Sequence, residues 1–137
     1  MKQLFILLMV LSVFWACKGP KGVVKVEKTE AQTMADSVEY GVETFDGKFD
    51  SWYAQHNRPA TYRSLEYYEN WNRQYVQEWN YKSTQAGKNS FFEPIVGYVQ
   101  NEKYGFDVNH KLFYYFQYVE NVLKIKILPG GPKVVNY

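Results

Sequence analysis

The feature that most constrains this chain is the stretch from Ser64 to Thr84, which carries large aromatic side chains at helical spacing. At about 100° per residue, its apolar side chains fall on one half of a helical wheel and its polar ones on the other. The apolar half comprises Leu65, Tyr67, Tyr68, Trp71, Tyr75, Val76 and Trp79. Ser64 stands where an N-cap is expected. The stretch therefore predicts a long amphipathic helix with an unusually aromatic buried face.

A second long helix is predicted downstream, with Asp107 as its N-cap. Its apolar seam is spaced 4, 3, 4 and 3 residues apart and consists of Val108, Leu112, Tyr115, Val119 and Val122. Such a seam is expected to pack against the aromatic face of the first helix. The residues 123–127 alternate apolar and charged side chains, which fits either a fraying helix end or a short third strand.

Shorter elements flank the two long helices. Residues 49–56 have the spacing of a short helix, which Arg58-Pro59 ends because the residue before a proline avoids helical angles. Residues 38–46 alternate as a strand with one buried face, and residues 92–100 read as a second strand with Pro94 at its start or at a sheet edge. The predicted fold is α+β, with two long amphipathic helices packed together beside a small antiparallel sheet.

The beginning of the chain is typical of a secretory leader. Residues 4–15 are apolar except for Ser12, a length that suits a signal-peptide core and is too short to span a bilayer. The only cysteine follows in Phe14-Trp15-Ala16-Cys17, which resembles the bacterial lipobox. The resemblance implies that Cys17 is lipidated and becomes the mature N-terminus. The alternatives are an ordinary secretory leader with a chance cysteine, or an uncleaved anchor.

The sequence divides into four parts on this basis. Residues 1–16 are the predicted signal peptide, 17–37 a flexible tether, 38–127 the α+β domain and 128–137 a tail. The tether is polar, and its three valines, Val23, Val24 and Val26, are too few to drive packing. A flexible chain of this length reaches about 25 Å, which would lift the domain clear of the lipid headgroups.

Charge and cysteine content exclude two classes of protein. The chain carries 16 basic and 14 acidic side chains, a net charge of +2. Nucleic-acid binding needs a concentrated basic footprint, so no nucleic-acid partner is expected. A single cysteine cannot form an internal disulfide.

Two polar side chains, Asn72 and Glu78, interrupt the apolar half of the first helix. A polar group there is costly if it is buried without a partner. One interpretation satisfies both inside the fold, Asn72 through backbone or Asn109 and Glu78 through Arg58 or a tyrosine hydroxyl. The other is a small polar pocket that recognises a ligand. The candidate contacts for a ligand or partner are Arg58, Tyr62, Glu78, Trp79 and Asn80.

The sequence predicts no enzyme, no metal and no cofactor. His56 and His110 are the only imidazoles, and Asp107-x-x-His110 could place two ligands on one helical turn. A zinc site needs three or four ligands, and no third is visible. The lone cysteine is assigned to lipid, and no serine stands in a strand–turn–helix elbow. No catalytic residue is therefore proposed.

Several short motifs resemble a known family. They are Phe49-x-x-Trp52, Arg58-Pro59, Asn72-Arg73-x-Tyr75-Val76-x-Glu78-Trp79-Asn80 and Tyr104-Gly105-x-x-Val108-Asn109-x-x-Leu112. Over about residues 38–122 the chain is similar to an uncharacterised family of short Bacteroidetes lipoproteins, a domain of unknown function. The resemblance implies the compartment and the extent of the domain. It implies no functional residue.

The predicted function is a membrane-anchored envelope lipoprotein that acts as a non-catalytic interaction module for another envelope protein. Exposed rings such as Tyr62, Tyr81 and Tyr98 would make the contact, although packing at the edge of the core explains them equally well. The alternative is binding of a glycan or peptidoglycan on aromatic faces. Residues 18–21 lack an acidic cluster, which favours an outer-membrane anchor that faces the periplasm over surface display.

Overall fold

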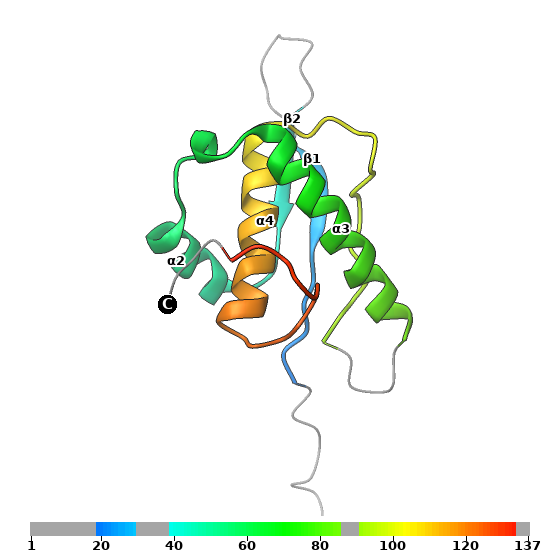
Figure 1. The fold of residues 1–137 in the computed structure, drawn as a ribbon. Helices are drawn as coiled ribbons and strands as arrows, with labels where there is room; N and C mark the ends of the chain where they lie inside the picture. The colour runs from blue at the N-terminus through cyan, green and yellow to red at the C-terminus, as the bar shows by residue number, and fades with distance from the viewer. Residues whose placement is uncertain (1–18, 30–38, 86–90, 134–137) are drawn as a thin grey trace, which may run out of the picture.

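The computed structural model describes residues 19–29, 39–85 and 91–133. Cys17 and the predicted signal peptide lie outside these ranges. The described residues form an α+β fold, as the sequence predicts (Figure 1). Its elements are β1 (Lys25–Thr29), β2 (Glu39–Glu43), α2 (Gly47–His56), the 3-10 turn η2 (Ala60–Tyr62), α3 (Leu65–Thr84) and α4 (Gly105–Asn121).

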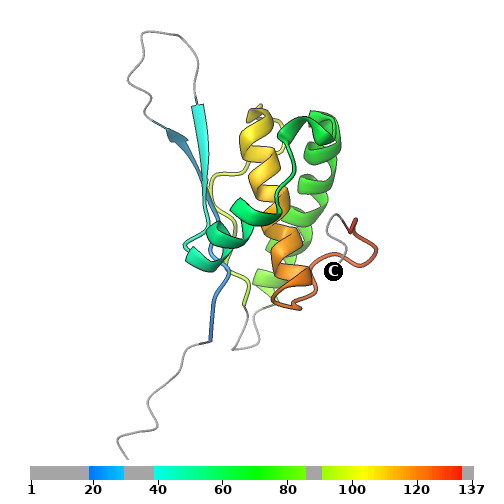
Figure 2. The same ribbon diagram turned by 90° about the vertical axis from the view of Figure 1, so that its left-hand side faces the viewer.

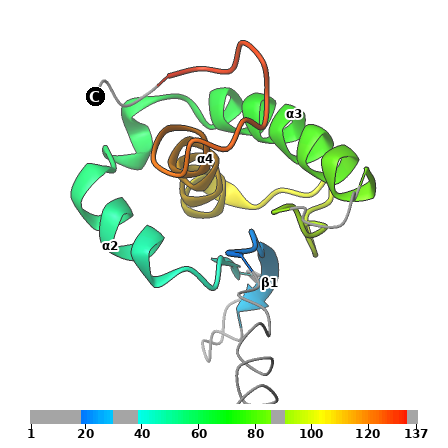
Figure 3. The ribbon, with the colours of Figure 1, turned by 90° about the horizontal axis from the view of Figure 1, so that it is seen from below.

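Helix α4 is the centre of the fold. It contacts α2, α3, η2 and β2, and Figure 3 shows it in the middle of these elements. Of the residues from Val108 to Val119, only Lys111 is not buried. A helix that is buried nearly all round needs apolar side chains on every face, and α4 has them. None of the described helices has the length and hydropathy needed to cross a bilayer.

Helices α3 and α4 pack side by side and run in the same direction. The Asn72 side-chain amide donates to the Asn109 carbonyl oxygen at 2.8 Å, close to the start of α4. Further along both helices, the Tyr75 ring stacks on Phe116 with centroids 4.9 Å apart. The first half of α3 thus contacts the first half of α4, and the second half of α3 contacts the second half of α4. The predicted packing of the two long helices is confirmed.

Local capping sets the starts of the helices. The Ser64 hydroxyl accepts a hydrogen bond from the Tyr67 N–H at 3.1 Å, so the predicted N-cap of α3 is confirmed. The Asp46 carboxylate accepts from the Lys48 N–H and starts α2. The predicted N-cap at Asp107 is wrong, because α4 begins at Gly105. Gly105 has a φ of +77°, which turns the chain into the helix two residues before Asp107.

The predicted tether is wrong for its described part, because residues 25–29 form β1. This strand pairs antiparallel with β2, with Val26 opposite Val42. Val24 and Val26 are only 0% and 5% exposed. Two valines are enough here because they alternate with polar residues, so both side chains point to the same face of the sheet. Figure 2 shows the two strands on one side of the helices.

Residues 92–100 do not form the predicted second strand. They make only isolated parallel bridges to the segment around β1, which pair Gly22 with Phe92 and Lys25 with Val96. The Val26 N–H donates to the Val96 carbonyl at 2.8 Å. Segment β1 therefore lies between β2 and residues 92–96. Pro94 has no N–H to donate, which limits the ladder to a few bonds.

The chain after α4 is neither a helix end nor a strand. The Glu120 carboxylate accepts hydrogen bonds from the backbone N–H groups of Ile127 and Leu128, at 2.9 and 2.8 Å. Ile127 is completely buried. One side chain at the end of α4 thus holds the following loop against the core.

Candidate functional site

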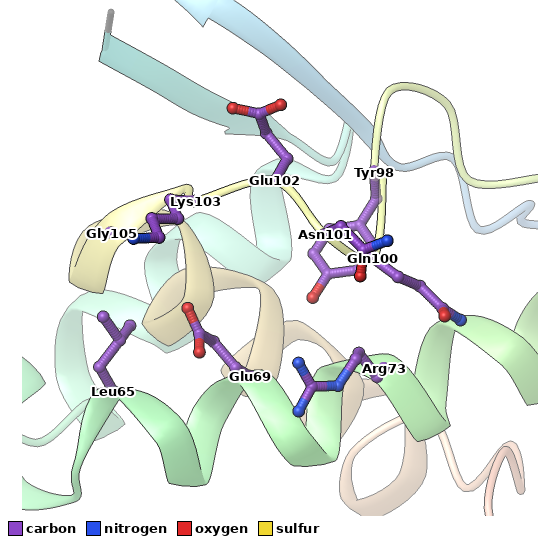
Figure 4. A pocket seen from close by; sticks show the side chains of 9 residues that line it. All are labelled: Leu65, Glu69, Arg73, Tyr98, Gln100, Asn101, Glu102, Lys103 and Gly105. Carbon is purple, nitrogen blue, oxygen red and sulfur yellow. The ribbon is translucent and has the colours of Figure 1, made fainter. Parts of the chain in front are cut away.

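A groove lies between the first half of α3 and the segment that leads into α4. Its volume is about 620 Å³, and it is open to solvent. Figure 4 shows its lining: Leu65, Glu69, Arg73, Tyr98, Gln100, Asn101, Glu102, Lys103 and Gly105.

One wall of the groove is a row of side chains on α3. Leu65, Glu69 and Arg73 are four residues apart, so they lie on one face of the helix. In Figure 4 the side chain of Glu69 points from α3 toward the opposite wall, and that of Arg73 lies along α3 toward Glu69. The Arg73 guanidinium donates to the Asn70 side chain. Among the described residues, Glu69 has no ion-pair partner, so its charge remains free for a ligand.

Aromatic residues hold the opposite wall in place. The Tyr104 hydroxyl donates to the Gly97 carbonyl at 2.9 Å and accepts from the Val99 N–H at 2.6 Å. The Tyr98 ring stacks on Tyr104 with centroids 5.1 Å apart. The Tyr40 hydroxyl of β2 donates to the Glu102 carboxylate, which points toward the strands in Figure 4. The wall is thus fixed to the sheet before any ligand binds.

The same segment is attached to the second half of α3 by two of the predicted ligand contacts. The Trp79 indole N–H donates to the Glu93 carbonyl at 2.6 Å, and Trp79 is completely buried. The Asn80 side-chain oxygen accepts from the Ile95 N–H at 2.9 Å. In this structure the Trp79 indole N–H and the Asn80 side-chain oxygen are used inside the fold. Their role is to position the segment that forms the groove wall.

The electrostatics of the groove are balanced. Its two acidic residues, Glu69 and Glu102, are matched by Arg73 and Lys103. Burial raises the pKa of the Tyr98 phenol to about 12, although the nearby Arg73 charge opposes the shift. Tyr98 therefore stays protonated at physiological pH and can both donate and accept a hydrogen bond. The lining as a whole offers charges of both signs, two amides and one aromatic ring.

The lining of the groove consists mostly of charged and hydrogen-bonding side chains. None of the nine lining residues is a histidine, cysteine or serine. The described residues contain no group of three His, Cys, Asp or Glu side chains that could hold a metal ion. The groove can hold a polar ligand through side-chain hydrogen bonds and charge pairs.

Two other predicted contacts lie together elsewhere. The Arg58 guanidinium covers the exposed Tyr62 ring at 4.9 Å, and Arg63 lies between the Tyr62 and Tyr67 rings at 5.2 and 5.1 Å. Arg58, Tyr62 and Arg63 precede α3 and contact only its first turn, while Trp79 lies about 20 Å further along that helix. The structure therefore does not bring the predicted set into one site. Cys17 lies outside the described residues.

Asn72 and Glu78 differ in how they are accommodated. Asn72 is buried, and its side-chain amide donates to the backbone and side-chain oxygens of Asn109, as predicted. Its own side-chain oxygen is buried without a hydrogen-bond partner among the described residues, so the prediction is confirmed only for the donor half of the side chain. Glu78 is half-buried, and none of the described residues bonds to its carboxylate. The predicted pairing of Glu78 with Arg58 is absent, because Arg58 lies beside Tyr62 before α3 begins.

Sequence reasoning found only Tyr98 of the groove residues. One available signal was the spacing of Leu65, Glu69 and Arg73 on one helical face. The other was the polar run from Gln100 to Lys103 before the second helix. Nothing in the sequence showed that these two segments meet, because their contact depends on the attachment of residues 93–95 to α3.

The fold and the groove define a small, aromatic-rich α+β domain built round one central helix. The chain belongs to the DUF6146 family, a family of unknown function, whose profile matches residues 4–130. The match extends beyond the residues 38–122 that carry the motif resemblance, and it includes β1. No curated protein and no solved structure matches the chain.

Proposed function

We propose that the protein is a membrane-anchored envelope lipoprotein whose groove binds an extended polar segment of another envelope protein. The anchor is Cys17, which follows an apolar leader of signal-peptide length. The groove is the binding site, and the protein acts by holding a partner without changing it chemically. The location that fits the leader best is the periplasmic side of the outer membrane.

The observation that supports a protein partner is the mixed charge of the groove. Glu69 and Lys103 have no ion-pair partner among the described residues, and Arg73 lines the same groove. Unpaired charges of both signs complement a polypeptide, which carries carboxylates and amines at fixed spacing. A neutral sugar leaves these charges without partners. The groove also lies where α3 and α4 begin. Tyr118, near the other end of α4, is about 20 Å along the helix from Gly105 in the groove.

Photo-crosslinking in the native envelope tests this proposal. The photoreactive residue p-benzoylphenylalanine replaces Gln100 in the groove, and Gln77 on the exposed side of α3 is the matched control. We expect a discrete protein adduct from position 100 only. Adding Arg73→Glu to the labelled chain should remove most of that adduct. The same adducts from both positions, or an adduct indifferent to Arg73→Glu, would contradict the proposal.

A glycan is the second candidate, and the combination of Tyr98 with Gln100 and Asn101 favours it. An aromatic ring flanked by amides provides a stacking face and hydrogen bonds for sugar hydroxyls. Binding to isolated peptidoglycan can be measured by co-sedimentation of the full chain. If sugar is the ligand, Asn101→Ala should lower the bound fraction and Gln77→Ala should not. If the groove serves a protein, neither substitution should change sedimentation.

The anchor has its own test. Mass spectrometry of the mature N-terminus should find acyl chains on Cys17, and Cys17→Ser should release the protein from the membrane fraction. An unmodified Cys17 in a membrane-bound protein would rule out the lipoprotein assignment.

A further inference from the structure

The described chain begins very close to the proposed anchor. Gly19 is two residues from Cys17, a distance of at most about 7 Å. The Gly22 N–H already donates to the Phe91 carbonyl at 2.7 Å, so the chain joins the fold at that residue. The five residue-to-residue steps from Cys17 to Gly22 span at most about 18 Å. Because the chain joins the fold at Gly22, the distance between Cys17 and the domain is shorter than a flexible tether over residues 17–37 would allow.

The end of the fold where the chain begins carries an exposed aromatic residue. Phe45, in the turn between β2 and α2, is 71% exposed. Its φ of +51° is in the left-handed region, which is unusual for a bulky residue. Figure 1 shows this turn at the end of the molecule where residues 19–22 lie. The fold therefore holds a large apolar side chain in solvent beside the start of the chain.

Lysines and further apolar residues surround Phe45. A second open cavity of about 620 Å³ is lined there by Pro20, Lys21, Phe45, Asp46, Gly47, Lys48, Phe91, Tyr118 and Leu123. The one carboxylate among them, that of Asp46, accepts hydrogen bonds from backbone N–H groups at the start of α2. The Lys21 ammonium pairs with Glu93. Lys48 is exposed and has no ion-pair partner among the described residues. Aromatic rings flanked by lysines are typical of surfaces that sit at the membrane–water interface.

We propose that this end of the domain, formed by residues 20–21 and 45–48, rests on the membrane that holds the lipid anchor. The occupant of the surface is the phospholipid bilayer, with Phe45 among the headgroups and Lys48 near lipid phosphates. The inference rests on the proposed lipoprotein function and deepens it. It also orients the molecule, because the groove lies at the start of α4 and this surface lies beside Tyr118 and Leu123 at its end. The groove then opens away from the membrane.

Depth-dependent fluorescence quenching tests the orientation. The full, lipidated chain has no free thiol if Cys17 is acylated, so a new cysteine can be labelled selectively with a polarity-sensitive dye. The test positions are Phe45→Cys and Lys48→Cys, and Val99→Cys beside the groove is the control. Each labelled protein is placed in vesicles of phosphatidylethanolamine and phosphatidylglycerol that contain lipids with a nitroxide quencher.

We expect loss of most of the fluorescence at position 45, a smaller loss at position 48 and little loss at position 99. Equal quenching at all three positions, with Cys17 shown to be acylated, overturns the inference and leaves the proposed function standing. An unacylated Cys17 overturns the lipoprotein function and the inference together. The thermal unfolding midpoint of each labelled protein identifies any variant that fails to fold, and the other test position then decides.

Discussion

At the scale of single residues, we expect the buried His110 to contribute to the response of the domain to acid. Its imidazole is buried between Tyr53 and Tyr68, and its Nδ1 shares a 2.7 Å hydrogen bond with the Tyr53 hydroxyl. Burial lowers the pKa of His110, and the opposing effect of the nearby Asp107 carboxylate is smaller. Below about pH 6.5 the unfolded chain takes up a proton that the folded state resists. Stability contributed by neutral His110 is therefore present above that pH and is lost as the pH falls toward the lowered value.

We predict that urea unfolding shows this loss as the pH falls below about 6.5. His110→Phe should make the unfolding midpoint less sensitive to acid, although it leaves the Tyr53 hydroxyl without its partner. His56→Gln, which removes the only other imidazole, should keep the acid sensitivity. A His110→Phe variant as acid-sensitive as the unmodified protein would contradict the assignment.

A second residue-scale prediction concerns Glu120. Its carboxylate accepts from the Tyr75 hydroxyl at 3.0 Å and from two backbone N–H groups of the loop after α4. Hydrogen bonds to a charged acceptor are stronger than neutral ones, and their loss leaves buried donors unpaired. We expect Glu120→Ala to lower the free energy of unfolding by about 3 kcal/mol. The control Glu66→Ala, at an exposed position of α3, should cost less than about 1 kcal/mol.

At the scale of elements, the close approach of residues 96–97 to β1 requires glycine. Gly97 has a φ of +82°, and a Cβ added there would collide with the Val26 carbonyl oxygen. Gly97→Ala should therefore cost more than about 2 kcal/mol in chemical denaturation, because neither the backbone nor the carbonyl can move away cheaply. Gly47→Ala is the control, since a Cβ on Gly47 has no atom within 4 Å. A Gly97→Ala variant as stable as the control would show that the approach is looser than described.

The elements that could be predicted from sequence are those that local patterns specify. Helix α3 begins after its Ser64 cap and keeps its aromatic face to the core, as its periodicity predicts. Strand β1 was missed because Val24 and Val26 gain burial only when β2 and residues 92–96 close on either side. The start of α4 was missed because Gly105 alone decides it, through a backbone conformation that spacing does not reveal.

At the scale of the whole molecule, the groove and the proposed membrane-facing surface at residues 20–21 and 45–48, here called the Phe45 surface, lie at opposite ends of α4. Neither could be predicted as a site, because each combines segments far apart in sequence. The groove joins α3 to residues 98–105, and the Phe45 surface joins residues 20–21 to residues 45–48 and 91. The predicted contacts Trp79 and Asn80 proved to be attachment points of the groove wall. Aromatic or polar residues on a predicted helix can therefore indicate either a binding site or a contact that holds a neighbouring segment in place.

The parallel course of α3 and α4 has a consequence for biogenesis. The chain must return along the length of α3 before α4 can start, and it does so by pairing with Gly22–Val26 near its own beginning. The segment Gly22–Val26 is synthesised early, but its partners at residues 91–96 follow about seventy positions later. The central helix α4 is synthesised after both. Contacts so distant in sequence close slowly. We expect the buried core to close only after α4 has left the ribosome, which would keep the chain open for the secretion that the proposed lipoprotein function requires.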